Sequence, residues 1–259
     1  MLRRLDRLAF IGGAIGLTAL AWVWLVLGAG MEMSAVEMTA MAGMDGWLMQ
    51  PATWTPAYAA LMASMWFVMM AAMMLPTTAP TVALYLKMTR DGEGRIGWRP
   101  AAFVAGYLAV WGGFSLAAAG LQWALETLRL LSPMLETTHA WLGAAILIAA
   151  GLWQLTPLKT ACLRHCRSPL GFILGGWRPG AAGAFRLGIG HGAYCLGCCW
   201  ALMALLFFGG VMNLYWIIGL ALWTLAEKTL PFGLWLGRAA GVMLIGWGGW
   251  LALTHGMGG

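Results

Sequence analysis

Cysteine and histidine side chains gather in one short segment, HGAYCLGCC, between residues 191 and 199. Helical spacing places His191, Cys195, Cys198 and Cys199 within one arc of about 100°, so these side chains share a helix face. Thiolate and imidazole groups suit a soft metal, namely Cu(I), Zn(II) or an iron–sulfur cluster. Buried cysteine also packs as a small apolar side chain. The density of cysteines next to a histidine favours a metal or redox role over inert packing.

A second pair of thiols, Cys162 and Cys166, occurs in the segment TACLRHCR. If this segment is helical, the two cysteines lie one turn apart on one face. Arg164, His165 and Arg167 surround them, and neighbouring positive charge favours the thiolate form. The pair is a further candidate for metal ligation, shared with the first cluster if the two segments meet. The sequence does not decide whether they meet.

Methionine is the third soft ligand type, because its thioether sulfur suits Cu(I). The chain has 19 methionines. One group shares a face of a predicted helix and consists of Met62, Met65, Met69 and Met73. Another group lies in a predicted outer loop and consists of Met31, Met33, Met38, Met41, Met44 and Met49. A helical methionine stripe is more typical of packing, whereas methionines in an exposed loop have no packing role, which favours the loop as a copper-binding segment.

Composition identifies the elements that must position these side chains. Of the 259 residues, 61% are hydrophobic and 9% are charged, where a soluble domain has about 25% charged residues. Uncharged stretches exceed the roughly 20 residues that a helix needs to cross a bilayer, and unpaired backbone groups in lipid require helices. No alternating pattern of a membrane β-barrel is present. We therefore predict an all-α polytopic transmembrane bundle that forms a single membrane domain over residues 1–259.

Seven spans are expected from the lengths of these stretches. They cover approximately residues 8–28, 58–87, 100–124, 138–156, 187–208, 213–230 and 236–255. A methionine-rich outer loop, 29–57, and a cytoplasmic connection, 157–186, join them. Pro76 and Pro80 fall inside the second span, and proline removes a backbone donor there, so we expect a kink or break near Pro76.

Lysine and arginine set the expected orientation. With the N-terminus in the cytoplasm and the C-terminus outside, every Lys and Arg except Arg129 lies on the cytoplasmic side, as the positive-inside rule requires. The formal net charge of +6 then reflects topology, with the lipid bilayer as partner and no nucleic acid. Glu227 and Lys228, at the end of the sixth span, are interpreted as an ion pair or as interface anchors. No constellation typical of hydrolysis is present, so we predict no catalytic residue.

Several segments together resemble a bacterial family, the domain-of-unknown-function 2182 group of predicted metal-binding integral membrane proteins. The segments are MWFVMMAAMMLPT, GYLAVW, QLTPLKTACLRHCRSP, GHGAYCLGCCWALMALLFFGGVMNLYWI and AEKTLP, within about residues 58–235. The motif residues are Met69, Met73, Met74, Pro76, Lys159, Cys162, Cys166, His191, Cys195, Cys198, Cys199, Met212, Asn213, Glu227 and Lys228. The resemblance implies metal binding and a location in the bacterial inner (cytoplasmic) membrane.

The leading hypothesis is a membrane protein that binds or transports a soft metal ion, Cu(I) in preference to zinc. Met65, Met69 and Met73 would line a route, and the segment from His191 to Cys199 would form an inner site. One alternative is a thiol- or cofactor-dependent membrane oxidoreductase, which the five cysteines motivate. Another is a non-catalytic subunit of a homo-oligomer or membrane complex, with GxxxG contacts at Gly12/Gly16 and Gly188/Gly192.

Overall fold

The computed structural model describes residues 2–31, 33–41, 53–88, 97–132 and 135–256 of the chain. Apart from one isolated bridge between Leu131 and Thr137, these residues contain no β-structure. The helices are α1 (Leu2–Val26), α2 (Ala35–Ala40), α3 (Pro56–Met88), α4 (Arg99–Thr127), α5 (Ala140–Leu155), α6 (Pro157–Arg167), α7 (Pro169–Gly176), α8 (Gly180–Ala204), α9 (Leu206–Gly209), α10 (Leu214–Thr229) and α11 (Gly233–Gly256). The predicted all-α class is confirmed.

Four helices in the described part of the chain are long and apolar enough to cross a membrane. They are α3, α4, α8 continued through α9, and α11. A fifth span is present if α5 and α6 count as one, although they meet at a bend of 64°. The protein is thus a multi-pass membrane protein, with fewer qualifying helices than the seven predicted. The apolar stretch Phe10–Val26 of α1 is shorter than a full span, and the 16 residues of α10 cover only about 24 Å.

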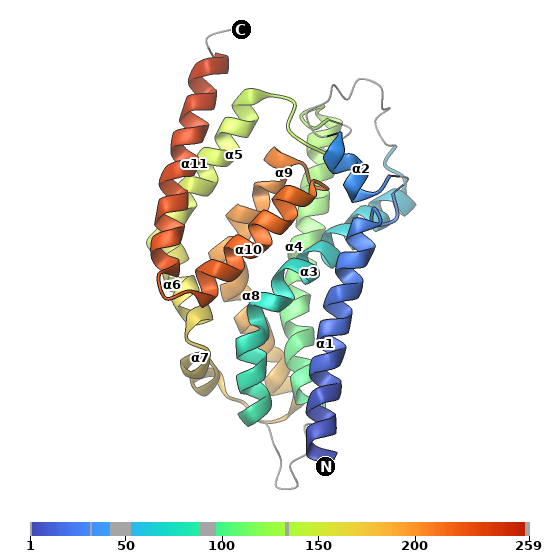
Figure 1. The fold of residues 1–259 in the computed structure, drawn as a ribbon, viewed down its shortest axis with the longest axis vertical. Coiled ribbons are helices and arrows are strands. Elements are labelled where there is room, and N and C mark those ends of the chain that lie inside the picture. Colours follow the sequence, from blue (N-terminus) through green and yellow to red (C-terminus); the bar gives the residue numbers. More distant parts are fainter. Residues whose placement is uncertain (1, 32, 42–52, 89–96, 133–134, 257–259) are drawn as a thin grey trace.

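The bundle is elongated, with the N-terminus at one end and the C-terminus at the other (Figure 1). We call these the N-terminal end and the C-terminal end. Helices α5 and α11 pack along each other on one side, α4 packs against both α3 and α8, and α1 packs on α3. Helix α10 crosses the bundle obliquely, so its two ends reach α2 and α6. This crossing brings the last turn of α10 close to the cysteine-bearing helices.

Prolines shape α3 and the junction of α5 with α6. Helix α3 continues without interruption through Pro76 and Pro80, and its course bends (Figure 1); of the expected kink or break, the structure thus shows a bend without a break. Helix α6 begins at Pro157, where a missing N–H costs nothing. Thr156 ends α5 and caps α6, because its side-chain oxygen accepts a hydrogen bond from the Lys159 amide at 3.2 Å. The cap fixes the direction of α6 relative to α5.

Glycines allow α4 and α8 to approach each other closely. A Cβ at Gly188 would collide with the carbonyl oxygen of Phe103, and a Cβ at Gly106 with that of Phe185. A Cβ at Gly192 would meet Val110 at 3.0 Å. The Gly188/Gly192 spacing therefore serves a contact within the chain, as small residues do between membrane helices. Gly12 and Gly16 have no atom of the described residues within 4 Å of such a Cβ.

Both long connections expected from the sequence contain helices. The segment 157–186 holds α6, α7 and the start of α8. The methionine-rich segment 29–57 holds α2, which begins with a capping box between Ser34 and Glu37; the Ser34 hydrogen bonds hold the pKa of the Glu37 carboxyl below its usual value. Met31 and Met38 pack against the core, so the premise that methionines of this loop have no packing role is wrong for these two. Met44 and Met49 lie outside the described residues.

Candidate metal centre

The three cysteines of α8 lie on one buried face, as the helical spacing predicts. Cys195, Cys198 and Cys199 are each 1% exposed. The thiols of Cys198 and Cys199 donate hydrogen bonds to the Cys195 carbonyl oxygen at 3.0 and 2.9 Å. Both thiols therefore turn back towards one backbone carbonyl on the same face of α8. We call the three side chains the thiol cluster.

Helices α3 and α4 close the thiol cluster on one side. The Cys199 sulfur lies 4.0 Å from the thioether sulfur of Met74. The Tyr107 hydroxyl lies 3.1 Å from the Cys195 sulfur and donates a hydrogen bond of 3.1 Å to the Met74 carbonyl. A thioether and three thiols thus face one another across the contact between α3 and α8.

Helix α6 brings the second pair of cysteines to the same place. The Cys162 sulfur packs on Gly197, where a Cβ would lie 2.8 Å from it, and the Cys166 thiol is near enough to that of Cys198 for the two to interact electrostatically. The two cysteine groups therefore meet, a point that the sequence left open. Cys162 and Cys166 are half-buried whereas the thiol cluster is fully buried, so the sulfurs extend from the core towards the surface of α6.

Lys228 enters the thiol cluster from α10. Its ammonium nitrogen lies 3.0 Å from the Cys195 sulfur and 3.2 Å from the Thr77 hydroxyl. Within the described residues, no carboxylate lies within salt-bridge distance of it. The interpretation of Lys228 as an interface anchor is wrong, because its side chain points into the bundle and is only 9% exposed.

Glu227, the neighbour of Lys228, belongs to a separate ion-pair cluster. Its carboxylate accepts hydrogen bonds from Lys159 at 2.7 and 2.8 Å, from Gln154 at 3.1 Å and from Trp223 at 3.0 Å. Lys159 also donates to the Gln154 side-chain oxygen. Arg167 donates to the Glu227 backbone carbonyl at 2.6 Å. The ion-pair interpretation therefore holds for Glu227, but its partner is Lys159 of α6 and not Lys228.

His191 lies one turn before Cys195 and is 3% exposed. Its ring packs among three aromatic rings, Phe103, Tyr107 and Phe172, with centroid separations of 5.9, 5.7 and 5.3 Å. Its Nδ1 atom is buried without a hydrogen-bond partner, which is costly in an apolar environment. The imidazole thus retains an unused ligand atom, while its ring contacts are aromatic.

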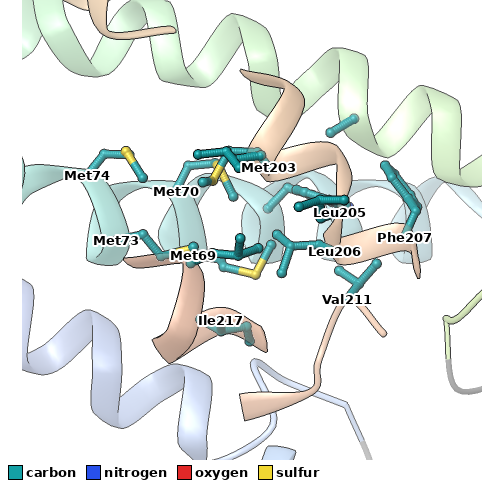
Figure 2. Packing of buried hydrophobic residues seen from close by; sticks show 14 of the residues in the cluster. Met69, Met70, Met73, Met74, Met203, Leu205, Leu206, Phe207, Val211 and Ile217 are labelled. Atoms are coloured by element: carbon teal, nitrogen blue, oxygen red, sulfur yellow. The ribbon is translucent and has the colours of Figure 1, made fainter. Parts of the chain in front are cut away.

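The methionines of α3 form a buried column along the helix. Met65, Met69 and Met73 are at most 1% exposed. Figure 2 shows neighbouring members of this column against residues of α8, α9 and α10 and the turn between them, among them Met203, Leu205, Leu206, Phe207, Val211 and Ile217. Packing therefore accounts for these methionines, and Met74 at one end of the column reaches Cys199.

The side chains at the thiol cluster carry soft sulfur atoms, but no group of three or more Cys, His, Asp or Glu side chains in the described residues has an arrangement ready to hold a metal ion. Thiol and thioether sulfurs select Cu(I). Thr77 and Tyr107, which also touch the cluster, were not predicted from the sequence, although Tyr107 belongs to the GYLAVW segment that carries the family resemblance.

These features define an all-α, multi-pass membrane protein with a buried, sulfur-rich centre. The chain belongs to the PpoB2 copper chaperone family, whose model matches residues 63–251. The matched range runs from α3 into α11 and includes all five cysteines, both buried lysines and Glu227. No curated protein and no solved structure gave a match. The resemblance to the domain-of-unknown-function 2182 group stays a prediction.

Proposed function

We propose that the protein carries Cu(I) as cargo, bound inside the membrane by the thiol cluster. Cys195, Cys198 and Cys199 supply thiolates, Met74 adds a thioether, and His191 offers its unpartnered nitrogen. The observation that carries the proposal is the meeting of sulfurs from α3, α6 and α8 at one buried point. Membership of a copper chaperone family supports copper over other soft metals.

Cys162 and Cys166 would pass the ion between the thiol cluster and the surface of α6. They are half-buried and touch the cluster through Gly197 and Cys198. Exchange between neighbouring thiols moves a soft ion without releasing it into an apolar core, where an unpaired charge is costly. Met65, Met69 and Met73 would line the approach from the C-terminal end. The protein then acts as a carrier in the membrane rather than as an enzyme.

The proposed location is the bacterial inner membrane, with the N-terminus in the cytoplasm and the C-terminus outside. Termini at opposite ends of the bundle support an odd number of crossings (Figure 1). Exposed cations at the end of α3 and around the starts of α4 and α8 support the cytoplasmic assignment. They are Lys87, Arg99, Arg178 and Arg186. Copper would then travel between the outer side and a cytoplasmic surface on α6.

Metal analysis of the anaerobically purified chain tests the thiol site. We expect near-stoichiometric copper after loading with Cu(I), and its loss from that site in a variant with Cys195→Ser, Cys198→Ser and Cys199→Ser. Ala193→Ser, on an exposed position of the same helix, is the matched control and should keep its copper. Thermal unfolding of the copper-free proteins shows whether each variant is folded. A folded triple variant that binds copper as tightly as the wild type would refute the site.

A separate variant tests the methionine route. Replacing Met65, Met69 and Met73 with Leu keeps size and apolar character, so each change should cost less than about 1.5 kcal/mol of stability. We expect slower delivery of copper to the thiol cluster with an unchanged final copper content. Met243→Leu, on the exposed side of α11, serves as the control. If the wild type, the triple methionine variant and Met243→Leu all take up Cu(I) at the same rate, these methionines serve packing alone.

A further inference from the structure

Glu126 is a carboxylate near the C-terminal end of the bundle without a cationic partner among the described residues. It lies in the last turn of α4 and is partly buried. Its oxygens accept hydrogen bonds from two neutral donors, Gln122 at 2.8 Å and the Trp54 indole at 2.6 Å. Arg129, three residues further along, is exposed and forms no ion pair with it. A negative charge is therefore held in place but not neutralised.

The methionine column ends beside this carboxylate. Met62 is fully buried, and its thioether sulfur accepts a hydrogen bond of 3.4 Å from the Gln122 side-chain nitrogen. The same nitrogen donates to Glu126, so a thioether sulfur and a carboxylate oxygen converge on one point. The Gln122 oxygen is fixed by the Trp66 indole at 2.7 Å. The Met62 sulfur and the Glu126 carboxylate oxygen both accept from the Gln122 side-chain nitrogen. A cation that displaces this amide nitrogen would therefore have both atoms as ligands.

We infer that Met62 and Glu126, bridged by Gln122, form a second Cu(I) site that captures the ion at the C-terminal end of the methionine column. The site rests on the proposed copper function and adds an entry point to it. The soft thioether selects Cu(I), and the carboxylate neutralises the charge that copper brings into a region of low dielectric constant. The Trp54 indole, which packs edge-on against Tyr58 with centroids 5.1 Å apart, covers the carboxylate.

The site differs in strength from the thiol cluster because it offers one thioether and one carboxylate instead of several thiolates. It should hold copper more weakly and pass it on to Met65 and then along α3 to Met74. A tight entry site would retain the ion, whereas a weaker one lets the ion move towards the cysteines.

Cu(I) binding to the full chain with Cys195→Ser, Cys198→Ser and Cys199→Ser tests the site in the absence of the thiol cluster. We expect this triple variant to bind about one Cu(I) per chain, more weakly than the wild type does. Adding Glu126→Gln or Met62→Leu should lower the affinity for this ion by about ten- to a hundredfold. Glu136→Gln, a carboxylate at the same end, and Met243→Leu are the controls and should leave it unchanged. The inference is overturned if the triple cysteine variant binds no copper. It is also overturned if the copper that this variant binds keeps the same affinity after Glu126→Gln and after Met62→Leu.

Methyl NMR of the intact protein, labelled at methionine methyl carbons, gives a second readout that needs no cysteine variant. The Met62 resonance is assigned by its loss in Met62→Leu. We expect it to shift on addition of Cu(I) in the wild type and to shift less in Glu126→Gln. A wild-type chain that loads copper at its cysteines while Met62 stays unshifted overturns the entry site alone. A wild-type chain that takes up no copper overturns the proposed function as well.

Discussion

Two buried polar regions lie side by side at the end of α10 and differ in how well their groups are satisfied. In the ion-pair cluster, the Glu227 carboxylate accepts hydrogen bonds from Lys159, Gln154 and Trp223. In the thiol cluster, Lys228 meets only a hydroxyl and a sulfur at hydrogen-bond distance. A saturated network rigidifies the core, whereas an unsaturated one leaves ligand atoms available. The contrast supports a structural role for the first region and is consistent with the copper binding proposed for the second.

The largest expected effect comes from breaking the ion pair. Lys159→Met alone would leave the Glu227 carboxylate buried without its cation, and the free energy of unfolding should fall by about 3–5 kcal/mol. Removing both charges with Lys159→Met and Glu227→Met should restore most of that loss, because a buried pair is often replaceable by apolar side chains. Unfolding in detergent measures both variants, and the double variant should still bind copper at the thiol cluster.

A folded double variant without copper would contradict the structural assignment of the ion pair. Equally, a single variant with wild-type stability would show that the carboxylate is satisfied without Lys159. Either result would remove the distinction between the two regions.

A smaller effect is expected at the glycine contacts that bring α8 to α4. Gly188→Ala places a Cβ against the Phe103 carbonyl, and this overpacking should cost about 1–3 kcal/mol. Gly190→Ala is the matched control, since its Cβ would lie 3.6 Å from Phe172, an ordinary contact. Thermal unfolding and copper content should fall together in Gly188→Ala and stay unchanged in Gly190→Ala. Equal behaviour of the two variants would mean that the helices separate without disturbing the cysteines.

The smallest effect on stability is expected for Lys228→Met. The ammonium meets a hydroxyl and a sulfur instead of a carboxylate, and relief of its desolvation offsets part of the lost hydrogen bonding, so the free energy of unfolding should fall by only about 1 kcal/mol. Unfolding of the copper-free Lys228→Met and Lys159→Met variants in the same detergent compares the two free energies of unfolding directly. A loss in Lys228→Met as large as that in Lys159→Met would show that the thiol cluster satisfies its lysine as fully as the carboxylate does.

Physical patterns in the sequence account for the helical membrane class and for the shared face of the α8 cysteines. Charge depletion and helical periodicity are local properties, and they predicted both. The Gly188/Gly192 spacing also predicted a close helix contact, which the structure places within the chain, against α4. What local patterns do not encode is the distance between helices. The meeting of Cys166 with Cys198 therefore had to come from the structure.

The charged pair at the end of α10 shows the limit most clearly. Adjacent Glu227 and Lys228 near a span end are compatible with snorkelling to the interface. The structure buries both, because Lys159, 68 residues away in sequence, pairs with Glu227 and the next residue then points into the thiol cluster. The number of spans was overestimated for a related reason. Apolar stretches such as α10 are helical but cross the bundle obliquely, so apolar length alone does not define a full span.

X-ray absorption at the copper K edge, measured anaerobically on the Cu(I)-loaded wild-type chain, tests sulfur ligation most directly. We expect a first coordination shell dominated by sulfur, which is lost when Cys195, Cys198 and Cys199 are all changed to Ser. A shell of nitrogen and oxygen that is the same in the wild type and the triple variant would contradict copper binding at the thiol cluster.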